Sequence, residues 1–277
     1  MGGLGSVGSV LEFRTVSVRR GPSLLLDSVD WRVEPGERWV LMGPNGAGKT
    51  TLLQIAAGRL HPTSGRVVIL GEELGAVDLS ELRQSIGWAS GSLLDSIPAA
   101  ESVHDTVLTG AWSVTGRWRE AYDTVDVQRA RELLSRWGLS GLAQRTFGTL
   151  SEGERKRTLI ARSLMADPEM LLLDEPAAGL DLAGRESLVA SLAEAASDPA
   201  SPTMVLVTHH VEEIPPGFTH ALLLSRGRIV AAGPLPDVMT DRHVSAAFGA
   251  PIVVEGRDGR WSARQSRQVA RGPGTAL

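Results

Sequence analysis

The chain has 277 residues, which allows one large domain or a domain with a smaller appendage. Its hydrophobic share of 42% and charged share of 22% are typical of a soluble globular protein, and no stretch reaches the roughly 18 apolar residues that a membrane-spanning helix needs. The absence of cysteine excludes disulfides, thiolate metal sites and cysteine nucleophiles, and a net charge of −4 argues against a general nucleic-acid-binding surface.

The first third of the chain predicts short strands and one helix. Alternating apolar and polar residues indicate two antiparallel strands joined by a turn at residues 20–22, and a later apolar strand leads directly into a glycine-rich loop. We expect strands at residues 10–18, 28–33, 38–42, 67–70 and 86–89, and a helix at 51–57 that ends at Gly58.

The rest of the chain alternates helices and strands after an insertion. Residues 93–150 have mostly helical periodicity, as in residues 127–137, and we interpret them as a helical subdomain inserted in the core. Next we expect helices at 152–166 and 182–196, strands at 170–173 and 204–207, and a closing hairpin at 221–232. Strands that alternate with helices predict a parallel sheet covered on both faces. Beyond about Pro251 the chain is rich in Arg, Gly and Ser, which predicts a frayed tail.

The loop after the 38–42 strand carries a phosphate-binding pattern. It reads Gly43, Pro44, Asn45, Gly46, Ala47, Gly48, Lys49, Thr50, with Thr51 next, and it fits the P-loop pattern G-x-x-x-x-G-K-[ST]. Inward-turned backbone N–H groups and the helix N-terminus would hold the phosphates of ATP. Lys49, one of only two lysines, would supply a compact charge and Thr50 a hydroxyl ligand for Mg²⁺. The alternative is a plain glycine turn, which the flanking strand and helix make the weaker interpretation.

Two later strands deliver polar residues to the same edge of the predicted sheet. The 170–173 strand ends in Asp174, which would hold Mg²⁺ directly or through water, and Glu175, which would polarise the attacking water. These acids could instead simply start a turn before Pro176. The 204–207 strand leads to His209 and His210, one of which could contact the γ-phosphate, although a His after a strand is more often structural.

One segment separates this chain from other P-loop ATPases. Residues 150–154, Leu-Ser-Glu-Gly-Glu, resemble the LSGGQ signature of ATP-binding-cassette (ABC) ATPases. Residues 178–181 look like the D-loop of that family, and Thr208-His209 is similar to its switch-histidine motif. The resemblance covers about residues 10–245. It implies an α/β fold: a P-loop NTPase (RecA-like) parallel-sheet core, an antiparallel β subdomain and the inserted helical subdomain, together residues 10–250, followed by an extension at 251–277.

The resemblance also implies how the site is assembled. In that family two nucleotide-binding domains pair head to tail, and each ATP lies between one phosphate loop and the signature helix of the other subunit. The signature residues Ser151, Gly153 and Glu154 would therefore act in trans, Asp181 would lie at the dimer interface, and His209 rather than His210 would sense the γ-phosphate. Ser151 and Glu154 also form a capping-box pattern, and we expect the carboxylates of residues 152 and 154 to point away from the nucleotide.

Three positions depart from the family pattern. Arg20 stands near the place of an aromatic residue that stacks on adenine; a guanidinium can also stack on a base, and an exposed turn arginine is the alternative. Gly91 takes the place of a glutamine that helps to bind Mg²⁺ and communicates with the membrane partner. Glu152 replaces the second glycine of the signature, which is a milder change.

Three functions stay open on the sequence alone. The first is an ATPase that powers transport through a separate membrane permease, as a cytoplasmic subunit at the inner face of the membrane; the start of the chain does not look like a secretory signal. The second is an ABC protein that acts on ribosomes or DNA, against which the acidic balance and the lack of a basic arm count. The third is a regulator without turnover, which the presence of Glu175 and His209 disfavours.

Overall fold

The computed structural model of the protein describes residues 8–117 and 121–266. Near the start of the chain, four strands form an antiparallel sheet in the order β2-β1-β4-β5. These strands are β1 (Leu11–Arg20), β2 (Ser23–Val33), β4 (Ser64–Ile69) and β5 (Glu72–Glu73). Apolar and polar residues alternate along these strands, so the apolar ones, for example Leu11 and Phe13, lie on one buried face of the sheet. The predicted antiparallel pair and its turn are confirmed.

The second sheet is the centre of the molecule, in the order β10-β9-β3-β8-β7-β6. Its strands are β3 (Arg38–Met42), β6 (Ile86–Ser90), β7 (Met170–Asp174), β8 (Thr203–Thr208), β9 (His220–Ser225) and β10 (Arg228–Pro234). All neighbours are parallel except β9 and β10, which form the predicted closing hairpin. Successive residues of β3 enter different cores: Trp39 packs with the antiparallel sheet and Val40 with the helices on the other face. The prediction of a parallel sheet covered on both faces is confirmed.

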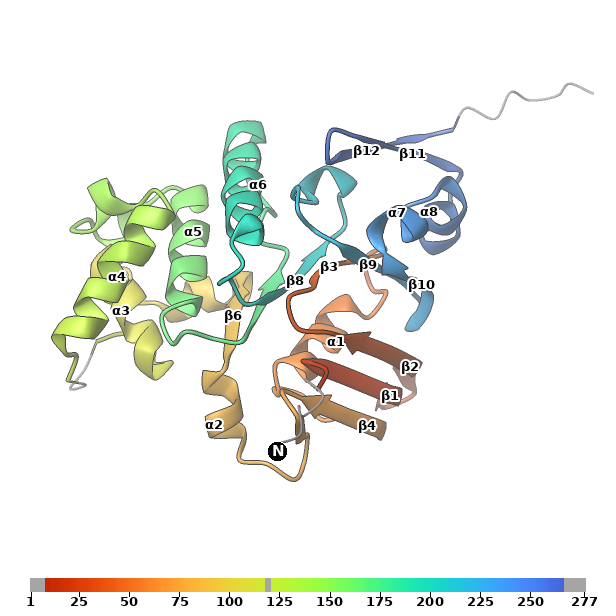
Figure 1. Ribbon diagram of the computed structural model, residues 1–277, viewed down its shortest axis with the longest axis horizontal. Coiled ribbons are helices and arrows are strands. Elements are labelled where there is room, and N and C mark those ends of the chain that lie inside the picture. The colour runs from red at the N-terminus through yellow and green to blue at the C-terminus, as the bar shows by residue number, and fades with distance from the viewer. Residues whose placement is uncertain (1–7, 118–120, 267–277) are drawn as a thin grey trace, which may run out of the picture.

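Helices cover this sheet, and a group of them extends the molecule beyond one end of the sheet (Figure 1). They are α1 (Lys49–Ala56), α2 (Leu79–Gln84), α3 (Val103–Leu108), α4 (Thr124–Arg136), α5 (Glu152–Ser163), α6 (Leu182–Ser197), α7 (Leu235–Val238) and α8 (Asp241–Phe248). Helices α3, α4 and α5 lie together at the end of the molecule opposite to α7 and α8. In the described ranges, no helix has both the length and the apolar character needed to cross a bilayer.

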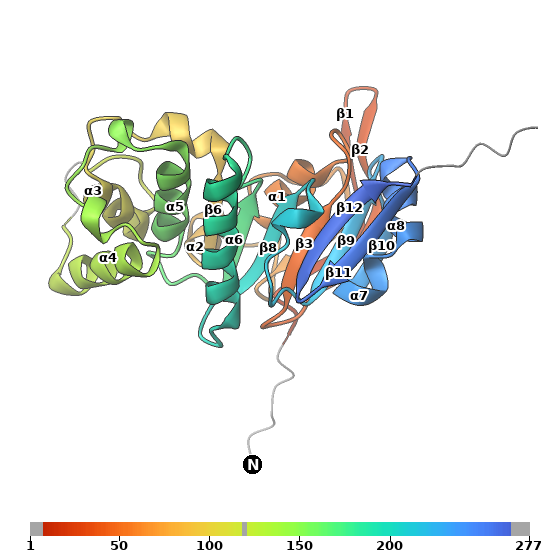
Figure 2. The same ribbon diagram turned by 90° about the horizontal axis from the view of Figure 1, so that it is seen from above.

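The frayed tail expected beyond Pro251 is wrong for residues 252–265. Strands β11 (Ile252–Arg257) and β12 (Arg260–Gln265) form an antiparallel hairpin, which lies near α8 in both views (Figure 2). Its turn residues Asp258 and Gly259 both have positive φ, the geometry that Asp-Gly pairs favour in two-residue hairpins. Residues 267–277 of the expected tail lie outside the described residues.

Candidate nucleotide-binding and catalytic site

The phosphate loop joins β3 to α1, as the sequence predicted. A side chain at Gly43 would bring its Cβ within 2.1 Å of the carbonyl oxygen of Leu224, and one at Gly48 would lie 2.7 Å from that of Leu25. Gly48 also has φ of 107° directly before the first residue of α1. Glycine is therefore required at both positions by space as well as by backbone conformation. Residues 45–51, Leu25 and Glu175 surround an open hollow of about 270 Å³.

Lys49 begins α1 and its side chain is only 6% exposed. Its Nζ donates to the carbonyl oxygens of Gly43 at 2.9 Å and Pro44 at 3.1 Å, and lies 3.9 Å from Oε1 of Glu175. Burial lowers the pKa of Lys49, while the charges of Glu175 and Asp174 oppose that shift. The ammonium group is thus held at the loop by backbone oxygens and one carboxylate, where an incoming phosphate would meet a fixed positive charge.

Asp174 ends β7 beside Thr50 of α1. The Thr50 hydroxyl hydrogen-bonds the Asp174 carboxylate, yet Oδ1 of Asp174 is buried and has no hydrogen-bond partner among the described residues. Burial, and then the charge of Glu175, raise the pKa of Asp174 to about 6, against the lowering effects of Lys49 and Thr50. A buried carboxylate oxygen without a partner, next to a hydroxyl and a second acid, fits a hard cation with oxygen ligands such as Mg²⁺.

Glu175 and His209 meet at the ends of two neighbouring strands. The parallel pairing of β7 with β8 brings the two strand ends level, and Nδ1 of His209 lies 3.3 Å from Oε1 of Glu175. Glu175 has φ of 47°, an uncommon backbone conformation for a residue with a side chain, and such strain is concentrated at functional sites. The ring of His210 contacts that of His209 in a tilted arrangement, with centroids 4.1 Å apart and planes at 44°. Of the two histidines, His209 is the one placed against the acid.

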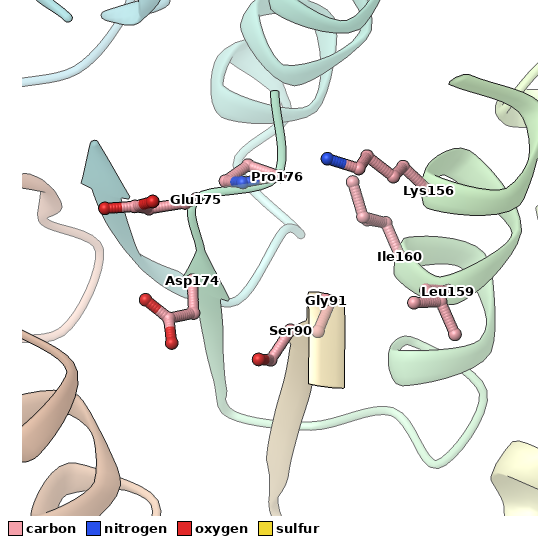
Figure 3. A pocket seen from close by; sticks show the side chains of 9 residues that line it. Ser90, Gly91, Lys156, Leu159, Ile160, Asp174, Glu175 and Pro176 are labelled. Atoms are coloured by element: carbon pink, nitrogen blue, oxygen red, sulfur yellow. The ribbon is translucent and has the colours of Figure 1, made fainter. Parts of the chain in front are cut away.

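A second hollow opens between the strand ends and α5. Figure 3 shows the carboxylates of Asp174 and Glu175 on one side of the β7 end and the amino group of Lys156 on the other. A larger hollow of about 490 Å³ shares these three residues and is also lined by Thr50 and Gly91. A Cβ at Gly91 would meet nothing within 4 Å, so this position has room for a side chain. The residue missing from the family pattern could therefore be accommodated without repacking.

Sequence reasoning gave no role to Lys156. Its side chain is 8% exposed; Nζ donates to the carbonyl of Ala178 and lies 3.6 Å from Oε1 of Glu152. It links α5 to the segment that follows β7, which contains Ala178. The signal that could have found it was composition, because Lys156 is the second of two lysines in a chain that otherwise uses arginine.

The predicted capping box at the start of α5 is confirmed. The Ser151 Oγ accepts from the backbone N–H of Glu154 at 3.3 Å, and the Glu154 carboxylate accepts from the backbone N–H of Ser151 at 2.8 Å. That second hydrogen bond lowers the pKa of Glu154. Gly153 follows in the first turn, and Asp181 caps α6 by accepting from the N–H of Gly184. The roles of these residues toward a second subunit stay predictions.

Arg20 lies at the exposed end of β1, where the β1–β2 hairpin turns. Leu25, from the other strand of this hairpin, lines the hollow at the phosphate loop. Stacking of Arg20 on the base stays a prediction.

A phosphate loop between a parallel strand and a helix, with acids at the end of a neighbouring strand, defines a P-loop NTPase. The model of the ABC transporter family matches residues 26–178, and the chain belongs to this family. The Bacillus subtilis uncharacterized ABC transporter ATP-binding protein YlmA is 42% identical over 88% of this chain and 93% of its own length.

Two solved structures show the same architecture. The cbiO1 protein of Clostridium perfringens, part of the ABC transporter complex cbiONQ, has a TM-score of 0.74 at 26% identity, covering 86% of this chain and 94% of its own. A dimeric ATP-binding cassette in a post-hydrolysis state with ADP and Pi has a TM-score of 0.69 at 26% identity, covering 81% and 98%. The protein is an ABC ATPase, which binds and hydrolyses ATP.

Proposed function

We propose that the protein is the Mg²⁺-dependent ATPase subunit of an ABC transporter, held at the inner face of the membrane by a separate permease. The observation that carries the catalytic part is that Lys49, at the start of α1, meets Asp174 and Glu175 at the end of β7, with His209 against Glu175. A charged lysine, a buried acid with one oxygen that has no partner among the described residues, and a second acid beside a histidine together suit phosphoryl transfer to water.

Each residue then has a separate role. The backbone N–H groups of residues 45–51 and the Lys49 ammonium bind the phosphates of ATP, and the Thr50 hydroxyl and the Asp174 carboxylate hold Mg²⁺. Mg²⁺, when bound, neutralises charge that develops on the phosphate oxygens. Glu175 accepts a hydrogen bond from the attacking water and orients it, and His209 holds Glu175 in place and contacts the γ-phosphate.

Two copies of the chain would pair head to tail. The dimeric cassette among the solved relatives supports this arrangement. On this chain, Ser151 is exposed at the N-terminus of α5, where the helix dipole attracts anions, and the apolar side chain of Leu182, next to Asp181, is 68% exposed. Both features are accounted for if a second subunit covers them and its ATP contacts Ser151.

The permease would dock beside Gly91. A pocket of about 250 Å³ between the end of α1, α2, β6 and η2 (Thr109–Trp112) is lined by Arg59, Arg83 and Arg162. Arg162 is 7% exposed, its Nε has no hydrogen-bond partner among the described residues, and burial lowers its pKa. The described part of the chain supplies these three arginines with no ion-paired carboxylate, so the pocket suits an acidic side chain of the partner.

The decisive experiment is purification of the tagged protein from gently solubilised membranes of its own host. The proposal expects a multi-spanning membrane protein to co-purify, and expects ATPase activity that depends on Mg²⁺. The Arg59→Glu variant should recover less of that partner, whereas Arg257→Glu, at an exposed position of the hairpin turn, should recover the wild-type amount. If the tagged protein co-purified with ribosomes or DNA and with no membrane protein, the transport assignment would be overturned in favour of an ABC protein that acts on ribosomes or DNA.

A further inference from the structure

The C-terminal hairpin contacts two elements that both lead to the candidate site. Helix α6 begins directly after Asp181, and the short 3₁₀ helix η5 (Val211–Glu213) begins two residues after His209. Strand β12 packs against η5, and β11 packs against α8. The hairpin therefore packs against the segment that follows the histidine, and its Arg260 reaches α6, the helix that Asp181 caps.

Arg260 makes the bridge. Its Nη1 donates to Oε2 of Glu186 at 2.8 Å and its Nη2 to Oε1 of the same carboxylate at 2.9 Å, so the pair is bidentate. Nη2 also donates to the backbone carbonyl of Glu212 at 3.1 Å. One guanidinium thus joins α6 to η5, and a planar fork is needed to make all three hydrogen bonds together.

The rest of the hairpin fixes Arg260 in place. The backbone N–H of Ala263 donates to the Glu212 carboxylate at 3.3 Å, and Trp261 packs against the main hydrophobic core. On the far side of η5, the Glu213 carboxylate accepts a hydrogen bond from the buried Thr208 hydroxyl. The turn between β8 and η5, which contains His209, is therefore held at both ends.

We infer that Arg260 is a positioning residue for ATP hydrolysis: it holds the histidine turn and the start of α6 in one fixed relation, which keeps His209 on Glu175. The inference rests on the proposed role of His209. Asp181 caps the same helix that Glu186 continues, so the bridge also fixes the D-loop relative to the histidine. Loss of the bridge leaves the phosphate loop unchanged, because none of the contacts of Lys49 involves η5, α6 or the hairpin among the described residues.

The test compares Arg260→Ala with Arg264→Ala. Arg264 lies four residues further along β12 and pairs with Glu255 of the same hairpin, so it controls for loss of an arginine on this strand. We expect kcat of Arg260→Ala to fall about tenfold, which corresponds to about 1.4 kcal/mol of transition-state stabilisation. The affinity of the monomer for ATP should stay within about twofold, because ground-state binding and turnover are separable. Arg264→Ala should match the wild type in both measurements.

Two further variants separate positioning from simple attachment of the hairpin. Arg260→Lys keeps the charge but cannot form the fork, so its kcat should lie between those of the wild type and Arg260→Ala. Glu186→Gln removes the charged partner and should lower kcat in the same direction. Hydrogen–deuterium exchange should rise in residues 208–213 of Arg260→Ala and stay unchanged in residues 43–51.

An unchanged kcat of Arg260→Ala, or an equal loss in Arg264→Ala, would overturn the inference. So would a loss of ATP affinity that matches the loss of kcat, because that would indicate general disruption of the fold. Failure of the proposed function looks different: the wild-type protein itself would hydrolyse no ATP, or His209→Ala would hydrolyse it at the wild-type rate.

Discussion

Asp174 is the residue whose environment departs most clearly from that of a free side chain. Its pKa is raised from 3.8 to about 6, with burial as the largest cause and the neighbouring charge of Glu175 next. An acid with a raised pKa in the folded state favours folding most while it is protonated. Its contribution is therefore fully present below the unfolded pKa and is lost as the pH rises through about 4 to 6. At neutral pH the nucleotide-free protein carries an unfavourable buried charge.

The first prediction follows from that charge. Asp174→Asn, an isosteric neutral change, should raise the free energy of unfolding of the nucleotide-free protein at pH 8 by about 1–3 kcal/mol. The difference from the wild type should shrink as the pH falls from about 6 toward 4. Urea unfolding at pH 5 and pH 8 measures both. Equal stabilisation at the two pH values would show that the charge of Asp174 is not the cause. The same variant should lose Mg²⁺-dependent hydrolysis, because the carboxylate ligand is gone.

The second prediction separates Lys49 from Glu175. Lys49→Ala should abolish ATP binding, because the main counter-charge to the phosphates is removed. Glu175→Gln should keep binding but stop turnover and accumulate an ATP-bound dimer, because only water activation is lost. Equilibrium ATP binding, ATPase rate and size-exclusion chromatography with ATP distinguish the two variants. A Glu175→Gln protein that hydrolyses ATP at the wild-type rate would contradict the role given to Glu175.

At the scale of elements, the proposed function makes the loop that follows β6 the link between the site and a docked partner. Gly91 starts the 3₁₀ helix η1 (Gly91–Ser96), with Ser90 capping it, and a Cβ at Gly91 would meet open space. The third prediction is that Gly91→Gln changes the basal ATPase rate by no more than about threefold, because Glu175 and His209 still supply the chemistry.

The same variant should change partner-stimulated turnover more than basal turnover. Gly91→Ala serves as its control, since it fills the position without adding an amide group. The comparison requires ATPase rates with and without the permease. A large rise in the basal rate of Gly91→Gln would show that glycine impairs the natural site, and would favour the regulator interpretation.

The elements themselves differed in how well the sequence predicted them. Strand β3 was predicted with its observed bounds, because five consecutive buried residues lie between a Pro-Gly turn and a glycine loop. The β11–β12 hairpin was missed, since its arginine-rich composition resembles a tail and its anchor, the pair of Arg260 with Glu186, spans 74 residues of sequence. The Asp258-Gly259 turn was the local signal available.

From the sequence, the site could be predicted only as a group of residues at the ends of neighbouring strands, without the contacts between their side chains. Parallel strands must present their carboxyl ends at one edge, so Asp174, Glu175 and the histidines could be placed near the phosphate loop from sequence. The choice of His209 rested on resemblance, and its 3.3 Å contact with Glu175 supplies the physical reason. The oxygen of Asp174 that has no partner among the described residues and the buried position of Lys156 both depend on packing between distant segments, which no local pattern encodes.

At the scale of the whole molecule, the central question is whether one subunit contains a complete site. Lys49, Thr50, Asp174, Glu175 and His209 lie within a single chain, while Ser151 is exposed at the N-terminus of α5. In a head-to-tail pair, each site takes its phosphate loop from one copy and Ser151 from the other. This arrangement makes the activity of a mixture of two damaged subunits predictable.

The fourth prediction uses that arrangement. Ser151→Ala should lower hydrolysis while leaving the affinity of the monomer for ATP nearly unchanged. Ser151→Gly should have the same effect on both quantities. Glycine is the milder change for helix stability, because it weakens the cap by only a few tenths of a kcal/mol, against about 1 kcal/mol for alanine. Mixing Lys49→Ala with Ser151→Gly subunits then creates heterodimers with one intact site and one doubly damaged site. With random pairing and independent sites, the mixture should recover about a quarter of the wild-type rate.

The control for that experiment mixes Lys49→Ala with Glu175→Gln. Both changes lie on the side of the phosphate loop, so each site of the heterodimer carries one of them and no intact site forms. Hydrolysis should therefore stay near zero in the control mixture and rise in the mixture with Ser151→Gly. Equal rates in the two mixtures would contradict head-to-tail pairing. Only Ser151→Gly changes the cap of α5, and a weaker cap can only lower the rate of its mixture. A higher rate in that mixture therefore reports the position of Ser151 in the dimer and not the stability of either subunit.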